Sequence, residues 1–168
     1  AEKFGEPSEY PFIQGLPGYP YINPIIKLED ETVNFGGTWH TDTAYLNEPP
    51  LGTMLLAKQV PPIGGDTIFA NLYSAYEGLS NGLKEVLSGM YAIHSSLKAD
   101  ASKTREDRIK DNGKQDAGEF QSSHPVVRTH PETKKKALYI NLGHTVRFDG
   151  WTEEESKPLL QYLYEHCV

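Results

Sequence analysis

Glycine and proline interrupt this sequence so often that long helices are excluded over most of its length. The chain has 15 glycines and 12 prolines among 168 residues, and pairs such as Pro49-Pro50, Pro61-Pro62 and Gly64-Gly65 separate short apolar runs. Because these residues favour turns, the pattern predicts short strands. Strands are expected at residues 25–28, 54–60, 67–70, 91–97 and 145–148, with a hairpin of residues 126–129 and 137–142.

Two short helices are expected between the predicted strands. They cover residues 72–79 and 83–87, and the candidate N-caps are Asn71 and Asn81. Asparagine is favoured at this position because its side-chain oxygen accepts a hydrogen bond from a free N–H of the first turn.

A third helix is expected at the end of the chain. Thr152 and Glu155 have the spacing of a capping box, in which each side chain bonds to the backbone of the other. Pro158 is expected to kink this helix or to delay its regular start. The apolar face comprises Leu159, Leu160, Leu163 and Cys167.

Composition excludes several classes of protein. The formal net charge is −7, so the chain lacks the basic surface that binds nucleic acid. No apolar run is long enough to span a membrane. The single cysteine, Cys167, excludes an internal disulfide and a cysteine-based metal site, and it favours a reducing compartment such as the cytoplasm. We expect one domain over residues 1–168, with homo-oligomerisation left open.

The segment from Lys98 to Glu119 differs from the rest of the chain. It mixes acidic and basic side chains and contains almost no large apolar residue. One interpretation is a solvated surface excursion. The other is a mobile active-site loop, because long loops in compact domains are often functional.

The first candidate for chemistry is the sequence His40-Thr41-Asp42. In an extended backbone, residues two apart point to the same face, so the imidazole and the carboxylate would converge. These are two of the three ligands of the facial triad that holds non-haem Fe(II). A structural hydrogen bond between the two side chains is the alternative, and His130-Pro131-Glu132 repeats the pattern in a predicted turn.

The surroundings of this motif form an ordered set of further motifs. They are Trp39-His40-Thr41-Asp42-Thr43-Ala44-Tyr45, Pro49-Pro50-Leu51-Gly52, Gly64-Gly65-Asp66-Thr67, His124-Pro125-Val126-Val127-Arg128-Thr129-His130-Pro131-Glu132-Thr133 and Ala137-Leu138-Tyr139-Ile140-Asn141. The succession resembles the TauD/TfdA family of Fe(II)- and 2-oxoglutarate-dependent dioxygenases, which includes taurine dioxygenase and the alkylsulfatase dioxygenases. The resemblance runs from about Val33 to the end of the chain.

The resemblance implies a fold, cofactors and site residues. The fold is mainly β with flanking helices, a double-stranded β-helix or jelly roll. His40 and Asp42 match the iron ligands, Thr67 matches a threonine that hydrogen-bonds 2-oxoglutarate, and Tyr45 and His144 match positions that line the substrate pocket. The implied partners are O2 and a small, anionic organic substrate, which is hydroxylated while succinate and CO2 are released.

One part of the family's site has no match. Family members carry a second iron-binding histidine and an arginine for 2-oxoglutarate further downstream, and no residue here matches either. We therefore expect this chain to supply part of the barrel and an incomplete metal site.

The substrate and two other functions stay open. A sulfonate such as taurine, a sulfate ester and a carboxylate are all compatible with the sequence. The main alternative function is a non-catalytic jelly-roll binding module or an inactive fragment. Hydrolysis at a zinc site is less favoured, because no third ligand stands at a recognisable spacing.

Overall fold

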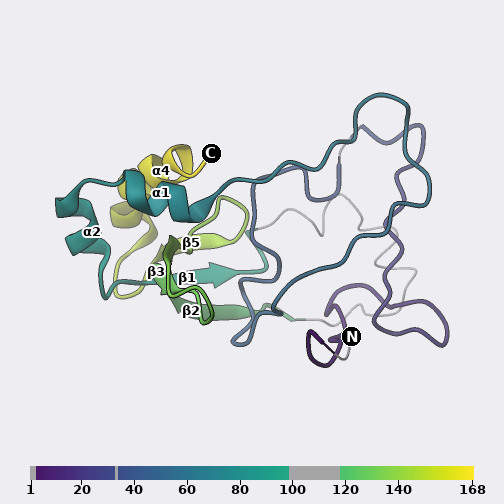
Figure 1. Ribbon diagram of the computed structural model, residues 1–168, viewed down its shortest axis with the longest axis horizontal. Coiled ribbons are helices and arrows are strands. Elements are labelled where there is room, and N and C mark those ends of the chain that lie inside the picture. The colour runs from purple at the N-terminus through teal and green to yellow at the C-terminus, as the bar shows by residue number, and fades with distance from the viewer. Residues whose placement is uncertain (1–2, 33, 99–117) are drawn as a thin grey trace.

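The computed structural model describes residues 3–32, 34–98 and 118–168, and it divides them into a folded half and a half made of long loops (Figure 1). Most of the expected active-site loop, residues 99–117, lies outside the described residues. The folded half contains these elements in chain order: α1 (Leu72–Gly78), α2 (Asn81–Leu87), β1 (Tyr91–Ser95), β2 (Gln121–Pro125), β3 (Val127–Thr129), β4 (Lys136–Leu138), β5 (Thr145–Phe148) and α4 (Glu153–His166).

The strands form two small antiparallel sheets. The larger has the order β2-β1-β5, and the smaller pairs β3 with β4, as the predicted hairpin required. In the central strand β1, every residue after Tyr91 is buried, because neighbours cover both faces. The pairing of β1 with β5 shifts between Ile93 and His94, which places Thr145 opposite His94.

The expected helices are present, and side chains cap them. Asn71 accepts hydrogen bonds from two backbone N–H groups of α1, as predicted. The cap of α2 is Ser80, so Asn81 is already the first helical residue. The capping box of Thr152 and Glu155 is formed, and α4 continues through Pro158.

The core lies where the helices cover the strands. Its largest fully buried apolar side chains are Leu87, Leu138, Ile140, Phe148 and Leu163. A polar link also joins α4 to β5. The backbone N–H of Phe148 donates to Ser156 Oγ over 3.0 Å, and that hydroxyl donates to the Thr152 carbonyl over 2.8 Å. The first turn of α4 is therefore held to the sheet.

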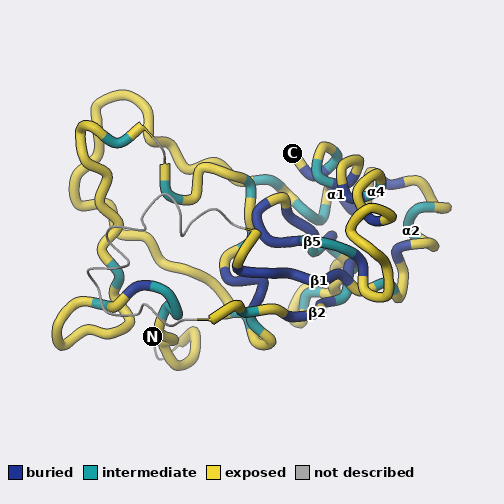
Figure 2. The backbone as a smooth tube through the Cα atoms, turned by 180° about the vertical axis from the view of Figure 1, so that it is seen from behind, coloured by how far each residue is buried: buried dark blue, intermediate teal, exposed yellow. Residues whose placement is uncertain are grey.

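Three predicted strands are wrong as far as the described structure goes. Residues 25–28, 54–60 and 67–70 lie in the loop half and form no strand. A strand needs a neighbour to pair its N–H and C=O groups, and these segments have no partner strand among the described residues. Their side chains stay exposed (Figure 2), reaching 82% for Met54 and 89% for Phe69.

The coarse class, strands with a few flanking helices, agrees with the expectation. The strands described here do not by themselves close into a jelly roll. Within the described residues, no helix is long and apolar enough to cross a membrane.

Removal of the α4 cap is expected to weaken the fold. Thr152→Ala takes away the acceptor for the Glu155 N–H and the hydroxyl that donates to the Glu155 carboxylate. We expect the free energy of unfolding to fall by about 1 kcal/mol, measured by urea denaturation. Thr152→Ser is the matched control and should keep most of the stability. Equal loss in both variants would contradict a role for the hydroxyl.

Candidate metal centre

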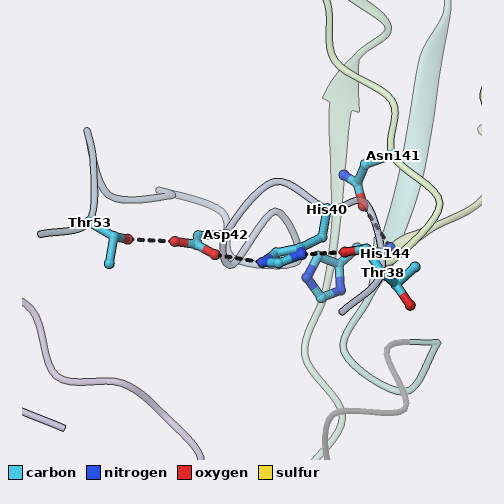
Figure 3. A network of polar contacts seen from close by, with 6 residues as sticks. All are labelled: Thr38, His40, Asp42, Thr53, Asn141 and His144. Carbon is cyan, nitrogen blue, oxygen red and sulfur yellow. Dashed lines mark hydrogen bonds and ion pairs between the residues drawn. The ribbon is translucent and has the colours of Figure 1, made fainter. Parts of the chain in front are cut away.

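The candidate ligands His40 and Asp42 converge on one point. Nε2 of His40 lies 3.0 Å from Oδ1 of Asp42 (Figure 3). The two side chains keep 32% and 49% of their surface exposed, so an ion from solvent can reach both. The two side chains are therefore close together and open to solvent.

Each ligand is oriented by a second hydrogen bond on its far side. Nδ1 of His40 lies 2.6 Å from the carbonyl oxygen of Thr38, which accepts only, so Nδ1 carries a proton and donates. Thr53 Oγ1 donates to Oδ2 of Asp42 over 2.6 Å. A ligating histidine in metalloproteins has this arrangement, because the outer bond fixes the tautomer and turns Nε2 toward the ion.

Electrostatics favours the charged forms of both side chains in the absence of a metal. The hydrogen bond to Asp42 is the largest cause that raises the pKa of His40 above its usual value. The same bond from His40 is the largest cause that lowers the pKa of Asp42, and Thr53 adds to it. A cation bound by both side chains would lie between Nε2 and Oδ1 in place of this hydrogen bond.

These distances fit a divalent cation. Neighbouring positions around an octahedral ion with bonds of about 2.1 Å lie about 3.0 Å apart, which matches the separation of Nε2 and Oδ1. Within residues 3–32, 34–98 and 118–168, no group of three or more His, Cys, Asp or Glu side chains could hold an ion. The described residues therefore offer two protein ligands.

Hydrogen bonds from the folded half hold the ligand-bearing segment on both sides. Gly143 N–H donates to the Trp39 carbonyl over 3.0 Å. After the ligands, Ser122 Oγ donates to the Ala44 carbonyl over 2.9 Å, and Nε2 of His124 donates to the Leu46 carbonyl over 2.8 Å. Strand β2 and the turn before β5 thus position a segment that has no regular structure of its own.

Glycine is needed where the turn before β5 meets His40. A Cβ built on Gly143 would lie 2.8 Å from Cβ of His40 and 3.4 Å from the Trp39 carbonyl oxygen. Real Cβ atoms essentially never approach a neighbour so closely. Gly143 thereby lets the two backbones come into contact.

The chain turns sharply just after Asp42. Thr43 has a φ of 48°, which is unusual for a β-branched residue, and its buried Oγ1 has no hydrogen-bond partner. This conformation turns the chain inward, so that Ala44 and Tyr45 are buried. The strain lies next to a candidate ligand, as is common at functional sites.

His144 and Tyr45 lie beside the pair. The ring of His144 lies 6.2 Å from that of His40 and 4.9 Å from that of Tyr45, measured between centroids. Burial, together with the charge of His40, lowers the pKa of His144 to about 4, and burial raises that of Tyr45. His144 is therefore neutral, and its buried Nδ1 has no hydrogen-bond partner among the described residues.

The structure groups four of the five predicted site residues. His40, Asp42, Tyr45 and His144 are linked by the contacts above. Thr67 is exposed, and none of the hydrogen bonds, ion pairs or ring contacts recorded for the described residues joins it to them. Sequence reasoning missed Thr53, Ser122, His124 and Gly143, because each of them contacts a residue that is distant in the sequence. It also missed Thr38 and Asn141, although these two bond to residues close by in the chain.

A comparison with known families identifies the chain. The family model described as "Taurine catabolism dioxygenase TauD, TfdA family" matches residues 2–168. The chain belongs to this family, which confirms the resemblance inferred from the motifs.

Individual relatives agree with this assignment. The chain is 33% identical over 160 residues, 95% of its length, to an alpha-ketoglutarate-dependent sulfonate dioxygenase of Saccharomyces cerevisiae, of which it covers 37%. It is 31% identical over 175 residues to an alpha-ketoglutarate-dependent sulfate ester dioxygenase of Pseudomonas putida. That alignment covers 100% of this chain and 56% of the relative. The chain thus spans about half the length of these relatives, or less.

A solved structure is similar in fold. AAD-2, determined in complex with Mn(II) and N-oxalylglycine, matches with a TM-score of 0.58 and 25% sequence identity. The match covers 77% of this chain and 50% of that one.

Gly143→Ala tests the contact that seats His40. The added Cβ would have to displace the His40 backbone, so we expect the free energy of unfolding to fall by about 1–3 kcal/mol. The NMR resonance of the His40 Cε1 proton should also shift. Gly82→Ala is the control, because a Cβ there meets open space. An unchanged His40 resonance in Gly143→Ala would contradict the close approach.

Proposed function

We propose that this chain carries part of the active site of an Fe(II)- and 2-oxoglutarate-dependent dioxygenase. The observation that carries the proposal is the pair formed by Nε2 of His40 and Oδ1 of Asp42, which lie 3.0 Å apart. Both side chains are partly exposed, and a second hydrogen bond orients each of them. The names of the relatives, both alpha-ketoglutarate-dependent dioxygenases, support the reaction class. The Mn(II) and N-oxalylglycine bound to AAD-2 support a divalent metal beside a 2-oxo acid analogue.

His40 and Asp42 are the residues that would hold the iron. When bound, Fe(II) supplies the activation of O2, coupled to decarboxylation of 2-oxoglutarate, that hydroxylates an aliphatic carbon. His40 would hold the metal through Nε2, while the Thr38 carbonyl keeps Nδ1 protonated. Thr53 donates a hydrogen bond to Oδ2 of Asp42, which would leave Oδ1 for the ion. Thr67 would donate a hydrogen bond to a carboxylate of 2-oxoglutarate.

The substrate is proposed to be a small organic anion that reaches Tyr45 and His144. Sulfonates and sulfate esters are the substrate types named for the two relatives. The buried Nδ1 of His144 has no hydrogen-bond partner within the described part of the chain, which supports a ligand contact there, because a buried polar atom without a partner is costly.

We also propose that the described strands are part of a jelly roll. The apolar segments at residues 54–60 and 67–70 are largely exposed and pair with no strand among the described residues, as strands without their neighbours would. Their pairing partners would come from outside the described residues. The chain's coverage of 37% and 56% of its relatives leaves room for such partners.

Substitution of either ligand tests the proposal. In the full-length protein, His40→Ala or Asp42→Ala should abolish succinate formation, because each removes one of the three protein ligands of a facial triad. The assay measures succinate and O2 uptake with Fe(II), 2-oxoglutarate and a panel of sulfonates, sulfate esters and carboxylates. The substrate class is identified by the compound for which succinate formation and O2 uptake are most tightly coupled.

His130→Ala is the matched control for this assay. His130 belongs to the competing motif but lies in the turn between β3 and β4, where it accepts hydrogen bonds from the N–H groups of Glu132 and Thr133. We expect nearly intact turnover. Equal loss in His130→Ala would contradict the choice of His40, and no succinate from the unmodified full-length protein would favour a non-catalytic binding module.

The 168-residue chain by itself should bind iron weakly. Two ligands leave the remaining coordination to water, and 2-oxoglutarate would lack the two-pronged charge pairing of an arginine. Anaerobic titration with Fe(II) and 2-oxoglutarate should therefore give no strong visible charge-transfer band. A tight, stoichiometric band would contradict this and would mean that one of His94, His124, His130, His144 or His166 completes the site.

A further inference from the structure

A completely buried histidine lies behind the candidate metal centre. His94 in β1 has no exposed surface, and its ring lies 5.5 Å from those of His124 and Tyr139. Burial is the largest cause that lowers its pKa to about 3, so the imidazole is neutral. It has no place in the proposed chemistry, although burying it costs free energy.

A hydrogen bond joins the buried ring of His94 to Thr145. Nδ1 lies 3.2 Å from Oγ1 of Thr145, and this hydroxyl already accepts the N–H of Asn141 over 3.0 Å. The Thr145 hydroxyl thus joins His94 to the backbone of Asn141, while Nε2 of His94 is buried and has no hydrogen-bond partner among the described residues.

A β-bulge brings these two residues together. Ile93 pairs with Arg147, but His94 pairs with Thr145, so Val146 is the extra residue of β5. A bulge of this kind redirects a side chain at the end of a ladder. Without it, His94 would lie opposite Val146, which has no group to bond.

From Thr145, further hydrogen bonds lead to the metal ligand. Oδ1 of Asn141 accepts the N–H of His144 over 2.7 Å, and Gly143 N–H holds the Trp39 carbonyl over 3.0 Å. The turn of residues 141–145 is thus tied at one end to His94 and at the other to the backbone beside His40. Figure 3 shows Asn141 and His144 on the core side of His40.

We propose that His94 is a positioning residue for the metal centre: its hydrogen bond with the Thr145 hydroxyl holds the turn of residues 141–145 against the His40 backbone. Of the two measurements that test this proposal, only metal affinity rests on the proposed function. His94 touches neither iron nor substrate, and its effect passes through Thr145, Asn141 and Gly143.

Two pairs of variants test this in the full-length protein. His94→Leu removes the acceptor at similar volume, whereas His94→Asn keeps an acceptor near the place of Nδ1. Thr145→Val removes the hydroxyl with little change in shape, whereas Thr145→Ser keeps it. His130→Leu controls for loss of a histidine elsewhere.

The first readout is hydrogen exchange by mass spectrometry on the metal-free protein. In His94→Leu and Thr145→Val, a peptide covering residues 139–147 should exchange about tenfold faster, because a buried hydroxyl or N–H loses its partner. A peptide covering residues 157–167 of α4 should be unchanged. Equal acceleration of both peptides, or of neither, overturns the proposal, because the effect would then be global or absent.

The second readout is Mn(II) affinity, followed by electron paramagnetic resonance. His94→Leu and Thr145→Val should weaken binding about tenfold, the size typical of outer residues that orient a ligand. His94→Asn and Thr145→Ser should bind within about threefold of the unmodified protein. The proposal is overturned if Thr145→Val leaves the Mn(II) affinity unchanged. It is also overturned if His94→Asn binds Mn(II) as weakly as His94→Leu does.

The two readouts separate this inference from the proposed function. An unmodified protein that binds no Mn(II) contradicts the metal site, and the exchange of the 139–147 peptide then decides the role of His94 alone. If His94→Leu does not fold, the Thr145→Val and Thr145→Ser pair decides both readouts.

Discussion

Three backbone carbonyl groups that accept hydrogen bonds from the folded half hold the candidate centre in place. The carbonyls of Trp39, Ala44 and Leu46 accept hydrogen bonds from Gly143 N–H, Ser122 Oγ and His124 Nε2. These bonds flank the two ligands on both sides, and the segment between them has no strand or helix to fix it. The positions of His40 and Asp42 therefore depend on donors contributed by β2 and by the turn before β5.

Burial divides the histidines near the centre into two kinds. The hydrogen bond to Asp42 raises the pKa of His40 at the surface, whereas burial lowers the pKa of His144 to about 4 and that of His94 to about 3. The pair of His40 and Asp42 thus keeps contact with solvent, and the neutral imidazoles of His144 and His94 are buried. Neutral side chains are favoured there, since an unpaired charge in the interior is costly to desolvate.

Local signals predicted much of the folded half. The Asn71 cap, the capping box of Thr152 and Glu155, and the hairpin of β3 and β4 depend on contacts between residues close in sequence. The strands expected at residues 54–60 and 67–70 failed for the opposite reason. Their apolar pattern is real, but a strand exists only with a neighbour, and the described residues provide none.

The sequence by itself determined which residue types could bind a metal, and the H-x-D spacing put His40 and Asp42 within reach of one ion. Its ordered motifs also indicated the family, which the family model confirms. Only the tertiary structure decided how the segment that carries these two residues is held, because Gly143, Ser122 and His124 lie far along the chain from the backbone carbonyls to which they donate. Hydrogen bonds and close backbone contacts over such separations exist only after the strands have paired, so no local pattern encodes them.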